Sequence, residues 1–245
     1  LLSQAGRRLA TLPDDLADRV ATAVGWQVRQ ADVLAGVPET DDWLVAGRSD
    51  TREDRIEVRR VWLRGATSGR WALILSFAAY RQSLDTSLAV GSVIHADLHR
   101  YPGHALRALL GDTTPDVAVP KNVGIGPVSG PIPTFFGTVE AGVEEVGRMI
   151  ADEPWVDRVP ILVAAAPTIV RGRWVLTDNT GSIPIADSDV PAVAGLATLL
   201  ALSGGGPVDL AVEWTPTGIV PLTVFTARGA VDIGPRADPS FVGAA

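Results

Sequence analysis

Three polar side chains in the stretch His95-Ala96-Asp97-Leu98-His99 have the types and the alternate spacing of a metal-binding set. On a strand, alternate side chains share a face, so His95, Asp97 and His99 would point the same way. A strand rises about 3.3 Å per residue, so the two histidines lie about 13 Å apart and cannot both reach one zinc ion. We therefore expect a half-buried strand whose polar face carries these residues, and no cofactor within this chain.

Arginine and tryptophan gather between Arg48 and Arg70, where acidic residues alternate with the arginines. The residues that could form a binding face are Arg59, Arg60, Trp62, Arg64, Arg70 and Trp71. One interpretation is a solvated strand pair held by cross-strand ion pairs. The other is a nucleic-acid-binding hairpin over residues 48–70, which requires the arginines on one exposed face and binding that weakens with salt.

The composition is that of a globular chain, with 47% hydrophobic and 20% charged residues among 245. A net charge of −7 argues against a general nucleic-acid-binding protein. Cysteine is absent, which excludes disulfides and thiolate zinc sites within the chain and fits the cytoplasm. The longest apolar run, Pro191 to Leu202, is shorter than the span of about 20 residues that crosses a bilayer, so no membrane partner is expected.

Apolar residues at three- and four-residue spacing predict the first two of three main helices, and an apolar run between capping residues predicts the third. They span residues 11–25, 135–152 and 189–202, and a shorter helix is expected over 4–10. Alternating or continuous apolar runs predict strands. These lie at residues 43–46, 54–64, 70–80, 92–98, 161–166, 173–176, 182–185, 208–214, 219–225 and 230–233.

Short turns join these strands into hairpins and predict an α+β fold of mostly antiparallel sheets. Residues 65–69 connect one pair, and residues 177–181, with Asp178 as a turn residue, connect another. The nearly continuous apolar run from Trp71 to Phe77 predicts a strand covered on both faces. The tryptophans beside the strands are expected to pack in the core.

A proline-rich segment divides the chain and suggests two subdomains. Five prolines between residues 112 and 133 exclude a regular helix or a central strand there. We therefore expect an N-terminal helix and β-rich subdomain over 1–111, a connector over 112–133, and an α+β subdomain over 134–245.

Several phrases of the sequence are similar to those of a known family. They are residues 61–65 (Val-Trp-Leu-Arg-Gly), 69–79, 96–103 (Ala-Asp-Leu-His-Arg-Tyr-Pro-Gly), 199–205 and Glu213-Trp214. Together they resemble the region C-terminal to the zinc motif in bacterial SWIM zinc-finger family proteins, over residues 11–225. The resemblance implies a cytoplasmic, non-enzymatic accessory protein in a protein complex. The family's Cys-x-Cys…Cys-x-His site has no counterpart here, so any zinc site is expected upstream of Leu1.

These observations favour a non-enzymatic interaction module that binds another protein. Nucleic-acid binding through the 48–70 hairpin is the alternative, and an enzyme with an unrecognised site is the second. A deep cleft with convergent titratable groups would support the enzyme. We name no catalytic residue.

Overall fold

The computed structural model describes residues 12–23, 28–53, 56–79, 84–104, 106–111, 136–186 and 190–236. The helix expected over 4–10 and the connector expected over 112–133 lie outside these ranges. The described helices are α2 (Asp14–Ala23), α3 (Gln30–Leu34), α4 (Val139–Asp152) and α5 (Val190–Ser203). The sequence pattern predicted three main helices and did not anticipate α3, which is only five residues long.

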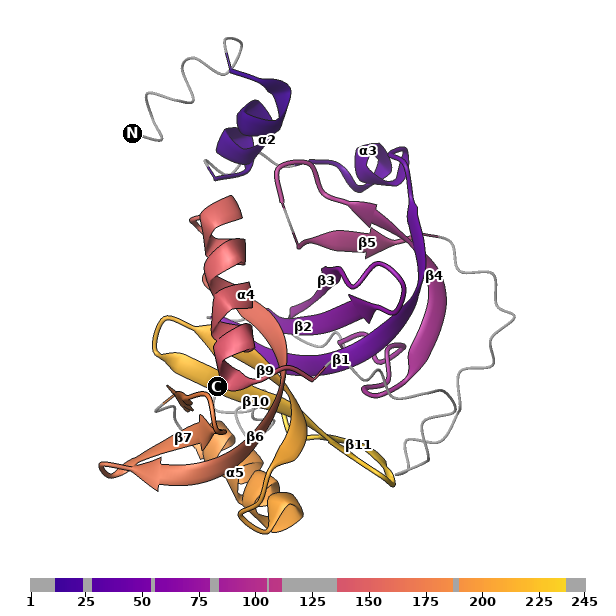
Figure 1. Ribbon diagram of the computed structural model, residues 1–245. Coiled ribbons are helices and arrows are strands. Elements are labelled where there is room, and N and C mark those ends of the chain that lie inside the picture. The colour runs from indigo at the N-terminus through magenta and orange to yellow at the C-terminus, as the bar shows by residue number, and fades with distance from the viewer. Residues whose placement is uncertain are drawn as a thin grey trace, which may run out of the picture.

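The strands form two antiparallel sheets, so the chain has an α+β fold (Figure 1). The first sheet has the order β3-β2-β1-β4-β5, with β1 (Glu39–Glu53), β2 (Ile56–Gly65), β3 (Trp71–Ala79), β4 (Val93–Arg100) and β5 (Ala108–Leu110). The second has the order β11-β10-β9-β6-β7-β8, with β6 (Val159–Val170), β7 (Arg173–Thr177), β8 (Ser182–Pro184), β9 (Val208–Thr215), β10 (Gly218–Thr226) and β11 (Gly229–Asp232).

The first sheet is curled and buries side chains on both faces. Trp43 and Val45 of β1 pack in a cluster on one face, while Leu44 between them packs on the other. The curl brings the two ends of the sheet together, because the Leu73 N–H of β3 donates to the Leu106 carbonyl just before β5 (2.7 Å). Because successive side chains of β1 point to opposite faces, this one strand contributes to two hydrophobic clusters.

The two sheets pack face to face through a shared apolar cluster. Leu44 and Trp62 of the first sheet meet Leu162 and Leu222 of the second, and all four are buried. At Gly47 a Cβ atom would lie 2.7 Å from the Leu222 Cβ, so this close approach requires glycine. The sheets are therefore in direct contact and share one core.

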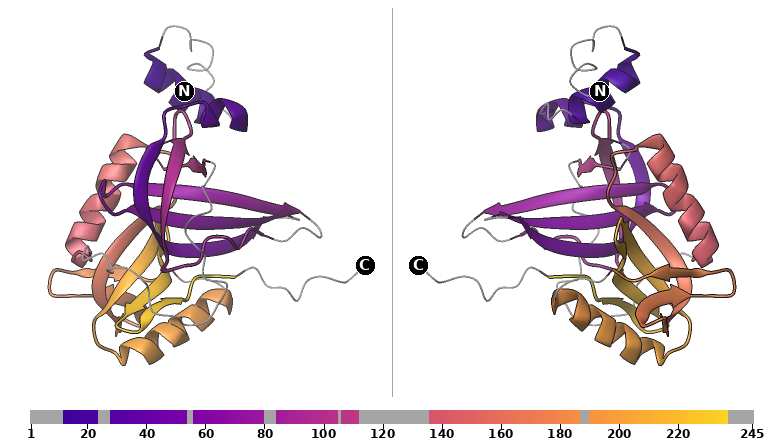
Figure 2. Two further views of the ribbon diagram at one scale, coloured as in Figure 1. Left: turned by 90° about the vertical axis from the view of Figure 1, so that its right-hand side faces the viewer. Right: turned by 90° about the vertical axis from the view of Figure 1, so that its left-hand side faces the viewer.

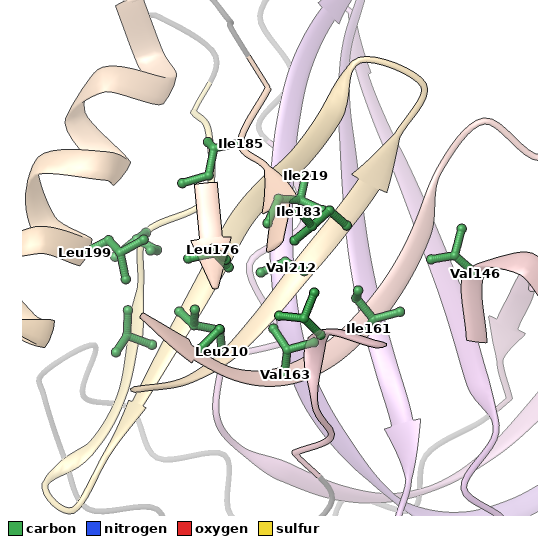
Figure 3. Close-up of a cluster of buried hydrophobic side chains, with 14 of the residues drawn as sticks. Val146, Ile161, Val163, Leu176, Ile183, Ile185, Leu199, Leu210, Val212 and Ile219 are labelled. Atoms are coloured by element: carbon green, nitrogen blue, oxygen red, sulfur yellow. The ribbon is translucent and has the colours of Figure 1, made fainter. Parts of the chain in front are cut away.

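Helices α4 and α5 cover the opposite face of the second sheet. Val146 of α4 and Leu199 of α5 point into one buried cluster with Ile161, Leu210 and Val212 of the sheet (Figure 3). The layers therefore run from the helices through the second sheet to the first sheet (Figures 1 and 2).

Strand β1 is much longer than the sequence predicted. A short strand over residues 43–46 was expected, but β1 extends over 15 residues to Glu53. Its polar second half pairs with β2 on one side, and on the other side the Asp50 N–H donates to the Pro235 carbonyl (2.9 Å). Pairing with the next strand on one side and with a segment distant in sequence on the other thus makes a strand from residues that look like a loop.

The prediction that the apolar run of β3 is covered on both faces is wrong for its second half. Trp71 at the start is 3% exposed, whereas Phe77 is 55% exposed. β3 lies at the edge of the first sheet, and its first half alone approaches α4 and the segment before β5. The far ends of β1, β2 and β3 project sideways from the body in both views of Figure 2.

Asp178 occupies the predicted turn between β7 and β8 and also caps α4. Its carboxylate accepts hydrogen bonds from the backbone N–H groups of Thr180 (2.7 Å) and Gly181 (3.1 Å), and from the Val139 N–H at the start of α4 (2.8 Å). Desolvation alone would raise the pKa of Asp178. The Thr180 hydroxyl and these N–H groups outweigh it and lower the pKa from 3.8 to about 2.

We expect the stabilisation from Asp178 to disappear in acid. Because the folded pKa is depressed, the contribution is complete above the unfolded value of 3.8 and is lost as the pH falls through about 2. Asp178→Asn should flatten the dependence of the unfolding free energy on pH within that window, as measured by urea denaturation. Thr180→Val keeps the carboxylate and should raise its pKa in an NMR titration. Identical pH profiles for Asp178→Asn and the unmodified chain would contradict this account.

Candidate functional site

The pleat of β2 divides the predicted binding residues between the two faces of the first sheet. Trp62 packs toward the second sheet, and its neighbours Val61 and Leu63 pack on the other face. By the same alternation, Arg60 and Arg64 lie on the face of Trp62. Arg59 lies on the opposite face.

Arg59 forms a buried ion pair with Asp50, its direct partner on β1. The Arg59 Nε donates to Asp50 Oδ1 (2.8 Å) and Nη2 donates to Oδ2 (2.7 Å), while Nη1 donates to the Asp85 carbonyl (2.6 Å). The hydrogen bonds with Asp50 raise the pKa of Arg59 despite its desolvation. A cross-strand ion pair is therefore confirmed, but it is buried: the two side chains are 9% and 4% exposed.

Trp62 binds a buried carboxylate between the sheets. Its Nε1 donates to Glu213 Oε2 of β9 (2.8 Å), and the Ser49 hydroxyl lies 3.4 Å from the same oxygen. Arg158 donates to the other oxygen of Glu213, which is fully buried. A buried carboxylate requires such partners to be stable. Sequence reasoning assigned Glu213 no role, because a single acid in an apolar strand does not reveal its partners.

Arg64 and Trp71 attach the hairpin to α4. Glu145 Oε1 accepts from Arg64 Nη1 (2.9 Å) and from Trp71 Nε1 (3.0 Å). The Arg64 guanidinium also lies over the Trp71 ring, 4.9 Å from its centroid. These contacts join two elements that are more than seventy residues apart, and they serve the packing of α4 on the first sheet.

The two remaining arginines have separate partners. Arg60 donates to the Thr51 hydroxyl (2.7 Å), and Arg70 lies 3.2 Å from the Glu39 carboxylate. Phosphate binding needs guanidinium groups that face solvent without a neutralising acid. The structure instead distributes the six predicted residues over both faces of the sheet, with Arg59 and Arg64 held by carboxylates. The nucleic-acid hypothesis gains no support from their arrangement.

The three metal candidates alternate along β4 and take different partners. The His95 Nδ1 lies 2.9 Å from Asp42 Oδ1, and the His99 Nδ1 lies 3.1 Å from the Gly36 carbonyl. Asp97 accepts from the Thr40 hydroxyl. Within the described residues, no three histidine, cysteine or acidic side chains converge in a way that could hold a metal ion.

An exposed apolar patch at the outer end of the hairpin was not anticipated from the sequence. Ile56 is 44% exposed and Phe77 is 55% exposed. Because Ile56 pairs with Ala79 and Val58 pairs with Phe77, the side chains of these four residues share one face. Leu75 continues the same face. We call Ile56, Leu75, Phe77 and Ala79 the hairpin patch. In the sequence, the only indication of this patch was the absence of charged residues from β3.

Comparisons with known proteins leave the geometry as the main guide to function. No family model matches the chain, and neither the curated proteins nor the solved structures contain a significant match to it. In the part of the chain that the structure describes, no helix has the length and apolar content needed to cross a membrane.

Proposed function

We propose that this chain is a non-enzymatic interaction module that binds another protein through the hairpin patch. The observation that carries the proposal is the exposure of Phe77 and Ile56, which are diagonal neighbours on one sheet face. Contiguous exposed apolar side chains on a globular protein mark interaction surfaces. A partner that covered the patch would gain about 25 cal/mol for each Å² of apolar surface removed from water.

The polar residues of the hairpin support the same proposal by their internal roles. Arg59, Trp62 and Arg64 each bind a carboxylate within the chain. They hold β2 in the sheet, against the second sheet and against α4. The hairpin is thus fixed at its inner end and presents apolar side chains at its outer end.

A hollow beside α5 is another place where a small molecule could bind, but no titratable side chain among the described residues lines it. The hollow between α5 and the second sheet is lined by Ile185, Ala186, Gly195, Leu196, Ile219, Val220, Pro221, Ile233 and Pro235. General acid–base catalysis requires a titratable side chain within hydrogen-bond reach of the substrate. This apolar hollow therefore adds nothing to the enzyme hypothesis.

The resemblance to the region after the zinc motif of SWIM zinc-finger family proteins remains part of the proposal. A role in a protein complex, which that resemblance implies, agrees with an exposed apolar patch. The division at residues 112–133 also remains a prediction. Each sheet comes from one side of that segment, and the two sheets share a core.

The proposal is tested by removing the hairpin patch without disturbing the core. The double variant Ile56→Thr/Phe77→Ser should weaken the binding of a partner at least tenfold. The partner would first be captured on the purified chain, identified, and then titrated as a purified protein by calorimetry.

The β6–β7 hairpin offers a matched control. Ile169 and Val170 are 55% and 45% exposed, so Ile169→Ser/Val170→Thr removes a similar amount of exposed apolar surface. Both double variants should unfold within about 0.5 kcal/mol of the unmodified chain, as surface substitutions do. Equal binding by the two variants would refute the hairpin patch as the interaction surface.

A further inference from the structure

Strand β3 differs from the other edge strands among the described residues. β5 and β8 have three residues each and β11 has four, and β8 ends in proline. β3 has nine residues without a charge or a proline, and its register with β2 contains no bulge. Short length, charges, proline and bulges are the features that normally prevent an edge from pairing with another chain. β3 has none of them.

Beside the hairpin patch, the outer edge of β3 presents backbone groups that pair with no other strand among the described residues. The Leu73 N–H points outward, because it donates to the Leu106 carbonyl. Backbone groups of every second residue point to the same edge. The N–H and C=O groups of Leu75 and Phe77 therefore also point outward. Within the described residues, pairing along that edge of β3 ends at the bridge between Leu73 and Arg107.

The dimensions of this edge select an extended peptide as its occupant. Residues 74–79 form a row about 20 Å long, at about 3.3 Å per residue. A stable interface between two globular chains buries about 800 Å² on each partner, more than one strand edge provides. An added strand instead gains affinity from main-chain hydrogen bonds, with side-chain contacts to adjacent apolar residues.

We propose that β3 binds an extended, uncharged segment of a partner protein as an additional strand of the first sheet. This inference rests on the proposed function and specifies its partner class. The added strand would pair with the backbone groups of Leu75 and Phe77, and end where Leu73 meets the segment before β5. Its alternate apolar side chains would contact the hairpin patch.

The probe is a blocked, fluorescently labelled heptapeptide of alternating threonine and valine. We expect saturable binding by fluorescence anisotropy, and slower hydrogen exchange at the Leu75 and Phe77 amides. A second peptide, N-methylated at every residue so that neither of its edges has an N–H donor, should bind at least tenfold more weakly. This comparison leaves the protein unaltered, so a folding defect cannot explain the difference.

A matched pair of protein variants gives a second measure. Phe77→Pro removes an outward N–H without breaking the ladder to β2, and should weaken peptide binding at least tenfold, whereas Ile169→Ser should not change it. Equal affinity for the two peptides, or no binding, would overturn strand addition. If a purified partner still binds in a Phe77-dependent way, the proposed function survives that failure. Self-association abolished by Phe77→Pro would show that a second copy, not a partner peptide, occupies the edge, and would also overturn the inference.

Discussion

Replacing Arg59 with methionine is expected to cost about 3–5 kcal/mol of unfolding free energy. The substitution removes three hydrogen bonds from a side chain that is 9% exposed, and leaves the Asp50 carboxylate buried without its counter-ion. A domain is stable by only about 5–15 kcal/mol, so the loss is a large fraction of the total. Urea denaturation followed by tryptophan fluorescence would measure it.

Two comparisons separate this effect from the general loss of an arginine. Arg70→Met removes a guanidinium whose side chain is 59% exposed, from a carboxylate that Arg100 also binds, and should cost about 1 kcal/mol or less. The double variant Asp50→Leu/Arg59→Met removes both buried charges and should recover most of the lost stability. Similar losses for Arg59→Met and Arg70→Met, or a double variant less stable than Arg59→Met, would contradict the importance of burial.

Truncation of Trp62 is expected to cost about as much stability as the loss of Arg59, and to destabilise both sheets. Trp62→Ala opens a cavity in the shared cluster and removes a donor from the buried Glu213, at a cost of about 3–5 kcal/mol. Trp62→Phe keeps an aromatic ring but loses the hydrogen bond and part of the buried volume, so a smaller cost of about 1–3 kcal/mol is expected. Hydrogen exchange should accelerate in β6 and β9 as well as in β1 and β2.

Trp155 provides the control for this second result. It is 53% exposed, compared with 1% for Trp62, so Trp155→Ala should cost about 1 kcal/mol or less. If Trp62→Ala accelerated exchange in the first sheet alone, the shared core would not couple the two sheets. The division at residues 112–133 would then also separate two independently stable units.

Much of the secondary structure could be predicted because it depends on local patterns. The stripe of apolar residues before Asp152 indicated α4, and the turn at Asp178 indicated the β7–β8 hairpin. Most strands were found for the same reason. The second half of β1 was missed, because its polar residues become a strand only through pairing with β2 and Pro235.

The candidate site was less predictable than the fold. The residues of the hairpin were identified, and the alternating charges indicated cross-strand ion pairs without naming one, which the structure forms between Asp50 and Arg59. Their burial was not indicated, since nothing in the local sequence says that Asp85 approaches the pair. The exposure of Phe77 was also missed, because an apolar run in a strand is normally covered on both faces.

The sequence by itself determined the type of each main element, the antiparallel hairpins and the alternation that separates Arg59 from Trp62, because these follow from backbone geometry over a few residues. The tertiary structure alone decided which polar groups are buried and which apolar groups are exposed. Glu213 becomes a buried partner of Trp62 only when the two sheets meet. Phe77 stays exposed because α4 reaches only the beginning of β3. Burial depends on contacts between residues far apart in the chain, which a local pattern does not contain.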